Sequence, residues 1–280
     1  LARLEHPNIV PIHEMGRNAD GQHFYTMKLV KGRTLHAILT AIKKGDALTT
    51  QHYTLDRLLT IYRKVCDAIA FAHHQRIIHR DLKPENVMVG EFGEVLVMDW
   101  GLAKHLDDHQ LAKLEDKQAK PTGIEGFKEL SDSQMAAGQA NLTLEGAVMG
   151  SPQYMPPEQA EGRLADIGTH SDIYSLGGIL YAILTLRHPV EGKRIEEVLA
   201  KVISVIITPP TTYNTTTLPT GTMTGEVADA RKVTGLPHCP GGKVPASLSA
   251  VTMRAMALKP ADRYATVAQL LADIEAYQGG

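Results

Sequence analysis

The stretch that decides the fold is Ile78-His79-Arg80-Asp81-Leu82-Lys83-Pro84-Glu85-Asn86, in the first third of a chain of 280 residues. Before it, apolar residues recur every three or four positions over residues 54–74, which predicts a helix that faces the core. After it, two apolar runs at 86–89 and 95–98 predict a pair of strands. The stretch is therefore expected to be a polar loop held between packed elements.

The residue types in this loop fit the chemistry of phosphate. A carboxylate such as Asp81 can orient a hydroxyl nucleophile, and Lys83 can neutralise a phosphate group. Asn86 and Asp99, which lies in Asp99-Trp100-Gly101 at the end of the second strand, supply oxygen ligands for a hard cation such as Mg²⁺. For any one of these residues alone, a solvated charged turn is the simpler interpretation.

Composition narrows the class of protein. With 29 basic and 31 acidic side chains the net charge is −2, so the sequence predicts no nucleic-acid-binding surface. Its 2 cysteines exclude a disulfide framework and favour a reducing compartment. The longest apolar stretch, residues 175–186, is shorter than the roughly 20 residues of a membrane span. We therefore expect a cytoplasmic chain without a membrane segment, although its parent could be membrane-anchored elsewhere.

The rest of the pattern predicts an α+β fold with strands first and helices later. An Asp-Gly pair at Asp20-Gly21 predicts a hairpin within residues 9–30, and Ser171 is the expected N-cap of a helix that runs to Leu186. We interpret residues 105–146 as a long mobile loop with a helical piece at 107–118. The Thr- and Pro-rich residues 208–224 are expected to lack the apolar surface needed for order. Further helices are predicted at 35–42, 195–205, 247–258 and 266–277.

Taken together, these segments resemble the eukaryotic-type serine/threonine protein kinases, in the style of their bacterial branch. Residues 79–86 are identical to the catalytic-loop motif of that family. Asp99-Trp100-Gly101 resembles its Asp-Phe-Gly motif, with Trp in place of Phe. Three more segments resemble the end of the activation segment, the opening of the central helix and the turn before the last helix: residues 150–159, 170–177 and 259–264. The resemblance extends over nearly the whole chain.

The resemblance implies roles for the residues of the loop. Asp81 would be the catalytic base, and Lys83 would contact the γ-phosphate of ATP, as in the Ser/Thr-specific branch. Asn86 and Asp99 would bind Mg²⁺. Arg80 would receive a phosphate from the activation segment.

Other matching positions would support the site. Ser151 would hydrogen-bond to Asp81 and Lys83 and shape the pocket for the substrate hydroxyl. Glu158 and Arg263 would form a structural ion pair. Asp172 would anchor the backbone of the catalytic loop.

The nucleotide base would lie against the strand that ends before Val30. By resemblance Met27 is the gatekeeper, and the Lys28 carbonyl and the Val30 amide and carbonyl would contact the adenine. Met88 would form the apolar floor beneath it. For a methionine on a strand, an ordinary core position is the competing interpretation.

The family's Gly-rich loop, strand Lys and helix Glu would all precede His6-Pro7-Asn8-Ile9-Val10. We therefore expect a fragment of a longer polypeptide, poorly active alone. Residues 1–30 would be a remnant of the N-lobe, with the end of its helix C, its strands 4–5 and the hinge. Residues 31–280 would be the C-lobe, with insertions at 105–146 and 208–245.

The expected function is transfer of the ATP γ-phosphoryl group to Ser or Thr of protein substrates in signalling. The alternative is a non-catalytic pseudokinase that binds partners, which a degraded Asp81, Asn86 or Asp99 would have favoured. Two further patterns are interpreted as structural. His73 and His74 suit the end of a helix, and Cys66 suits the buried face of the same helix.

Overall fold

The computed structural model describes residues 4–17, 23–106, 151–204, 206–214 and 235–280. The first three residues, the tip of the predicted hairpin and the helical piece predicted at 107–118 lie outside these ranges. Within them, helices make up most of the structure and the sheets are small, which agrees with the predicted α+β class.

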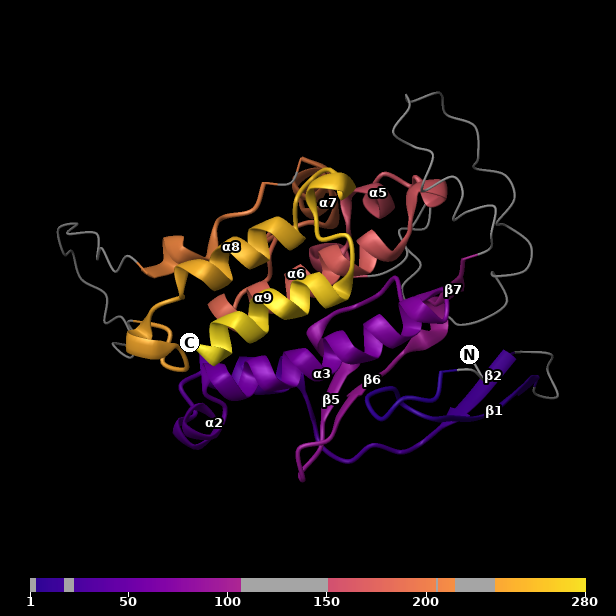
Figure 1. The fold of residues 1–280 in the computed structure, drawn as a ribbon, viewed down its shortest axis with the longest axis horizontal. Helices are drawn as coiled ribbons and strands as arrows, with labels where there is room; N and C mark the ends of the chain where they lie inside the picture. Colours follow the sequence, from indigo (N-terminus) through magenta and orange to yellow (C-terminus); the bar gives the residue numbers. More distant parts are fainter. Residues whose placement is uncertain (1–3, 18–22, 107–150, 205, 215–234) are drawn as a thin grey trace.

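The N-terminal part is the predicted hairpin, with strands β1 (Ile12–Arg17) and β2 (His23–Met27) antiparallel. It lies at one edge of the molecule (Figure 1). The segment before β1 is joined to strand β6 (Val95–Val97), because the Val10 N–H donates to the Val97 carbonyl at 3.1 Å and the Val97 N–H to the Asn8 carbonyl at 2.8 Å.

Helix α3 (Leu55–His74) lies at the centre of the larger part, and its bounds agree with the helix predicted over residues 54–74. Its N-cap is Thr54. Helix α9 (Val267–Gly279) packs between α3 and α8 (Ala246–Ala255) (Figure 1). The buried helix α6 (Thr169–Thr185) contacts both α3 and α8. The other α-helices within the described ranges are α1 (Leu35–Lys43), α2 (Ala47–His52), α5 (Pro157–Ala160) and α7 (Ile195–Ile203).

Two short sheets frame the polar loop. One has the order β3 (Arg33–Thr34), β5 (Val87–Val89) and β6, and the other pairs β4 (Ile77–Ile78) with β7 (Lys104–His105). His105 and Leu106 therefore belong to the folded part and not to a mobile loop. His105 pairs with Ile77 in the sheet, and the Leu106 side chain is buried, so the fold holds both residues in place.

The core joins α3 to α6. Leu58, Leu59, Val65 and Cys66 are fully buried on the inner face of α3, and the Tyr62 hydroxyl donates to the Leu176 carbonyl at 3.1 Å. Burial raises the pKa of the Cys66 thiol well above its usual value, so this side chain is uncharged. The structural interpretation of Cys66 is confirmed.

The predicted N-cap of α6 is wrong by three residues. The helix begins at Thr169 with Gly168 as its N-cap, and Ser171 is the third residue of the helix. The Ser171 hydroxyl still accepts the Gly168 N–H at 3.2 Å. It thus satisfies a donor that the start of the helix would otherwise leave without a partner.

The prediction that residues 208–224 cannot become ordered is wrong for residues 208–214. Asn214 binds both backbone groups of Val244, with its Nδ2 donating to the carbonyl at 2.9 Å and its Oδ1 accepting the N–H at 2.7 Å. The Arg187 guanidinium lies 4.8 Å from the ring centre of Tyr213. These contacts supply the order that the composition of the segment does not.

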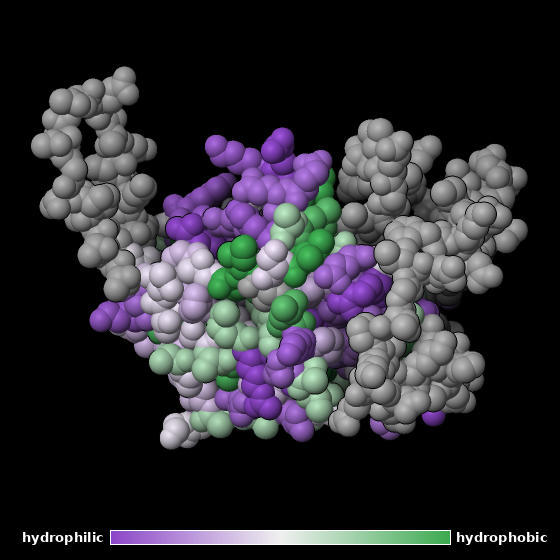
Figure 2. Space-filling view, turned by 90° about the horizontal axis from the view of Figure 1, so that it is seen from above, coloured by the Kyte–Doolittle hydropathy of each residue, from purple (hydrophilic) through white to green (hydrophobic). Residues whose placement is uncertain are grey.

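The described surface is mixed in character. One face carries polar residues around a small group of strongly apolar residues near its middle (Figure 2), which is ordinary for a folded domain. Among the described residues, none of the helices is both long and apolar enough to cross a membrane.

Gly177 provides the first test, because a side chain added at this position of α6 would run into the end of α8. A Cβ atom at this position would lie 2.6 Å from Met256 Cγ and 2.9 Å from Ala255 Cβ. We expect Gly177→Ala to lower the free energy of unfolding by about 1–2 kcal/mol, since the clash outweighs the gain in helix propensity. Chemical denaturation measures the change.

The control is Gly279→Ala near the end of α9, where an added Cβ would meet nothing within 4 Å. This variant should be neutral or slightly stabilised. Equal effects of the two substitutions would contradict the close packing of α6 on α8.

Candidate active site

One buried carboxylate, that of Asp172, holds the backbone of the polar loop (residues 78–86). Asp172, in the first turn of α6, accepts the His79 N–H at 2.9 Å through Oδ2 and the Arg80 N–H at 2.9 Å through Oδ1. Arg80 has φ of 68°, a left-handed conformation that a non-glycine residue adopts only where its surroundings enforce it. The role expected for Asp172 as the anchor of the loop backbone agrees with this geometry.

A histidine that the sequence analysis set aside completes the anchor. His73 Nε2 lies 2.8 Å from Asp172 Oδ2. Burial alone would raise the pKa of Asp172, but the hydrogen bond and charge of His73, with smaller contributions from His79 and the Arg80 amide, lower it instead. Asp172 is therefore a carboxylate. The partnership was not visible in the sequence, because His73 and Asp172 meet only when α3 packs on α6.

The loop and the segment that begins at Ser151 converge on Asp81. Lys83 Nζ donates to Asp81 Oδ2 at 2.8 Å and to Ser151 Oγ at 2.8 Å. The Ser151 N–H donates to Asp81 Oδ1 at 3.1 Å. Three of the predicted site residues thus share one small network, and Asp81 itself is buried.

Asn86 joins the same network. Its Nδ2 donates to the Asp81 carbonyl at 2.8 Å and to Asp81 Oδ2 at 3.2 Å. Because the amide nitrogen is used as the donor, Oδ1 is the atom that Asn86 can offer to a cation. Asp99 follows β6 with φ of 59°. An amide oxygen and a carboxylate suit a hard cation such as Mg²⁺, which takes few protein ligands. No cluster of three or more His, Cys, Asp or Glu side chains suited to a metal occurs among the described residues.

The structure accommodates Trp100 at the position where the Asp-Phe-Gly motif has Phe. Its ring centre lies 4.6 Å from that of His79, and its indole Nε1–H donates to the Val97 carbonyl at 3.2 Å. The one polar atom of the larger side chain is thus satisfied in the core. His79 Nε2 is 3.0 Å from the Met98 carbonyl, and burial lowers the pKa of this imidazole, so it is neutral at pH 7.

The Arg80 side chain points to the segment after Asp99, where its Nε donates to the Leu102 carbonyl. Its backbone carbonyl accepts a hydrogen bond from Gln159 Nε2 at 3.2 Å. Arg80 therefore links the loop to both ends of the long segment between Asp99 and Glu158. Its expected role as a phosphate receptor stays a prediction.

The residues predicted to bind the nucleotide base lie apart from this network. Met27 and Lys28 are exposed, and the Lys28 N–H is taken up by the Pro11 carbonyl at 3.0 Å. Val30 packs against the core, and Met88 is half-buried on β5 opposite Leu96. Among the described residues, no hydrogen bond joins any of these four to Asp81.

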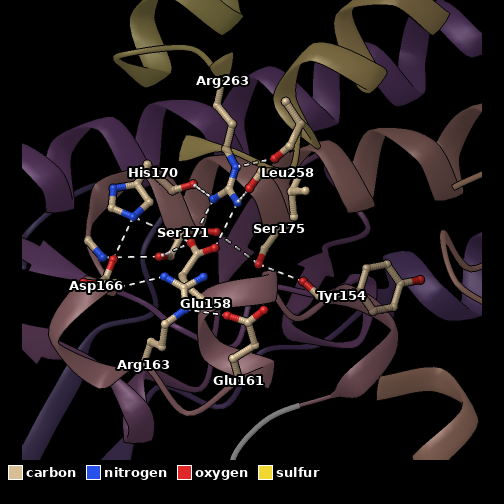
Figure 3. Close-up of polar contacts among 12 residues, drawn as sticks. Tyr154, Glu158, Glu161, Arg163, Asp166, His170, Ser171, Ser175, Leu258 and Arg263 are labelled. Carbon is tan, nitrogen blue, oxygen red and sulfur yellow. Dashed lines mark hydrogen bonds and ion pairs between the residues drawn. The ribbon is translucent and has the colours of Figure 1, made fainter. Parts of the chain in front are cut away.

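The segment after Ser151 is fixed by the pair Glu158 and Arg263, both fully buried (Figure 3). Arg263 binds both carboxylate oxygens, at 2.8 and 2.9 Å, and Ser171 Oγ donates to Oε1 at 2.8 Å. The remaining Arg263 donors reach backbone carbonyls, among them His170 at 3.0 Å and Leu258 at 3.1 Å. The predicted ion pair is present.

Comparison with known proteins gives one family. The model described as the protein kinase domain matches residues 1–222. A serine/threonine-protein kinase PknD of Protochlamydia amoebophila is 33% identical over 283 residues, and those of Chlamydia abortus and Chlamydia caviae are 33% and 31% identical over 285 and 286 residues. Each alignment covers 100% of this chain but 24–26% of the relative. The chain thus spans about a quarter of the length of these curated relatives.

Removing the arginine of the buried pair tests the support of the site. We expect Arg263→Ala to lower the free energy of unfolding by about 3–5 kcal/mol, because Glu158 would remain as a buried charge without its partner. The matched control is Arg254→Ala. Arg254 is exposed, its Nη1 lies 3.9 Å from Asp273 Oδ2, and its guanidinium lies 4.2 Å from the ring centre of Tyr264. Its loss should therefore cost only about 1–2 kcal/mol. Similar costs in urea denaturation would contradict the importance assigned to the buried pair.

The same pair predicts sensitivity to acid. Burial would raise the pKa of Glu158, but the hydrogen bonds and charge of Arg263 outweigh it and hold the pKa below the usual 4.5. A lowered pKa stabilises the fold above about pH 4.5, and this contribution is lost as pH falls through the folded-state value. The stability difference between the native chain and Glu158→Gln should therefore shrink below about pH 4.5. A difference that is constant from pH 7 to pH 3 would be the contrary result.

Proposed function

This chain belongs to the protein kinase family, and from that premise we propose that the protein transfers the γ-phosphoryl group of ATP to Ser or Thr side chains of protein substrates. Members of the family use ATP and a divalent metal. The observation that carries the proposal is the convergence of Lys83, Ser151 and Asn86 on the Asp81 carboxylate. None of the findings favours the pseudokinase alternative, since Asp81, Asn86 and Asp99 are all present.

In the proposed reaction, Asp81 orients the substrate hydroxyl and takes its proton as the oxygen attacks the γ-phosphorus. The bond from phosphorus to the bridging oxygen breaks, and ADP leaves. Lys83, already 2.8 Å from both Asp81 Oδ2 and Ser151 Oγ, supplies positive charge beside the transferred group. Because the chemistry of phosphoryl transfer depends mainly on position and charge, a preformed network of this kind is what the reaction requires.

A bound Mg²⁺ would neutralise phosphate charge, and Asn86 Oδ1 and the Asp99 carboxylate are the groups we assign to hold it. Their supports are already in place, since Asn86 is oriented by Asp81 and Asp99 follows the buried strand β6. Arg80 is the group we assign to bind a phosphate on the activation segment.

For the nucleotide base we keep the assignment of Met27 as gatekeeper, with Met88 as the floor. The Lys28 carbonyl and the Val30 amide and carbonyl would meet the adenine edge. The position of Met88 supports this, because it lies on β5 only two residues after Asn86.

We also propose that residues 1–30 and 31–280 belong to different lobes. Strand β2 ends at Met27, and the first helix of the larger core begins at Leu35.

Replacing the proposed base tests the function. In the full-length protein, Asp81→Asn should lower the rate of phosphate transfer from γ-labelled ATP by about 100- to 10,000-fold, because an amide cannot accept the proton. The isosteric change should leave the fold intact, which a thermal melt checks.

The control is Asp67→Asn on the exposed side of α3, which should keep the native rate. Label on Ser or Thr with the native protein, lost only in Asp81→Asn, would agree with the proposal. A folded native protein that labels no protein substrate, or an Asp81→Asn variant of normal rate, would refute it.

A further inference from the structure

A small hollow lies beside the candidate active site, between α1, the polar loop and the end of α6. Its walls include Pro84, the neighbour of Lys83, and Tyr154, which follows Ser151 by three residues. Lys83 and Ser151 both contact the network around Asp81. The hollow is therefore next to the place where a substrate hydroxyl would bind, and a substrate segment on Asp81 would pass close to it.

The charged side chains that line this hollow are basic. Lys43 reaches it from the last turn of α1, and Arg187 from the residues after α6. His36 and His188 also line it, with ring centres 6.4 Å apart, whereas no Asp or Glu is among its lining residues. This concentration of positive charge is local, because the chain as a whole has a net charge of −2.

Nearby acidic residues leave much of this charge available. Glu85 Oε1 is 2.8 Å from His36 Nδ1, and Glu191 Oε1 is 3.7 Å from Arg187 Nη1 on an exposed pair. The Arg187 guanidinium also lies 4.8 Å from the ring centre of Tyr213, a contact that does not neutralise its charge. Lys43 forms no ion pair within the described ranges. Burial lowers the pKa of His188, whose Nδ1 is 3.1 Å from the Tyr154 hydroxyl. Lys43 and Arg187 are thus the two permanent cations of the hollow.

The size of the hollow limits what it can hold. Its volume of about 50 Å³ is far below the roughly 300 Å³ at which pockets for whole small molecules begin. It is large enough for a few waters or for the head group of one side chain. A carboxylate or a phosphate has both the size and the charge that the walls require.

We propose that this hollow selects protein substrates with an acidic or phosphorylated side chain near the acceptor Ser or Thr. The inference rests on the proposed kinase function and adds a substrate class to it. The charge that discriminates comes from Lys43 and Arg187, while Tyr154 and Pro84 place the hollow beside the acceptor site.

The opposite preference, for a basic side chain paired with Glu85, fits the structure less well. Glu85 Oε1 is already paired with His36 at 2.8 Å. Glu85 Oε2 has no hydrogen-bond partner among the described residues, but it is buried and therefore not open to a substrate side chain that arrives from solvent. A guanidinium of the substrate would have to displace His36 to reach this carboxylate, and would first pass Lys43 and Arg187.

The experiment uses the full-length protein and peptides with one acceptor in an alanine background. Asp, phosphoserine, Ala or Arg is placed in turn at each of the neighbouring positions, and kcat/KM is measured. Since one exposed ion pair is worth up to about fivefold, we expect Asp at one or more positions to raise kcat/KM about fivefold over Ala, and Arg to lower it. Peptides with Asp and with phosphoserine separate a carboxylate site from a phosphate site.

Substitutions at two residues, Lys43 and Arg187, locate the effect. Lys43→Glu and Arg187→Glu should each abolish or reverse the preference, and Lys43→Met and Arg187→Met should reduce it. Lys44→Glu is the matched control, because Lys44 is exposed on the adjacent position and does not line the hollow. It should keep the native preference.

Equal rates for Asp, Ala and Arg peptides would overturn the inference, as would a preference that survives the changes at Lys43 and Arg187. Transfer to a generic denatured protein would then leave the proposed function standing. If neither peptides nor that protein are phosphorylated, the proposed function fails and the inference with it.

Discussion

The structure depends on the carboxylate of Asp172. It is buried at the start of α6, and it accepts the amides of two successive loop residues, His79 and Arg80, one of which is held at φ of 68°. Without it, these amides would be buried donors lacking partners, which is costly in a protein interior. His73 keeps Asp172 oriented and charged. The position of Asp81, directly after Arg80, follows from this anchor.

The first turn of α6 also joins the loop to the segment that faces it. Ser171, the neighbour of Asp172, donates to Glu158, whose carboxylate is bound by Arg263. Adjacent residues of one helix therefore hold the loop that carries Asp81 and the segment that begins at Ser151. This explains how the Ser151 backbone N–H can meet the Asp81 carboxylate, 70 residues away in sequence, at 3.1 Å. The two sides of the site are built on a common rigid base, the arrangement that positional catalysis needs.

Sequence alone predicted the longer helices and the two strands of the hairpin, because hydrophobic periodicity is a local signal. It missed the short helices α2 and α5 and placed the N-cap of α6 three residues too late. It also predicted the pairing of Glu158 with Arg263 and the contacts of Ser151, by resemblance to a family. It missed His73, whose partner lies on another helix, and the order of residues 208–214, which comes from Val244 and Arg187. The basic hollow was missed for the same reason, since Lys43 and Arg187 come together only in the folded chain. Local signals predict elements, whereas contacts between distant elements require the structure.

The central claim is that the anchored loop is a phosphoryl-transfer site. A crystal structure of the full-length protein with Mg²⁺ and a non-hydrolysable ATP analogue tests it most directly. The account predicts Mg²⁺ bound by Asn86 Oδ1 and the Asp99 carboxylate, with Lys83 beside the γ-phosphate and Asp172 still holding the His79 and Arg80 amides. A nucleotide bound elsewhere, or a metal that neither Asn86 nor Asp99 contacts, would contradict it.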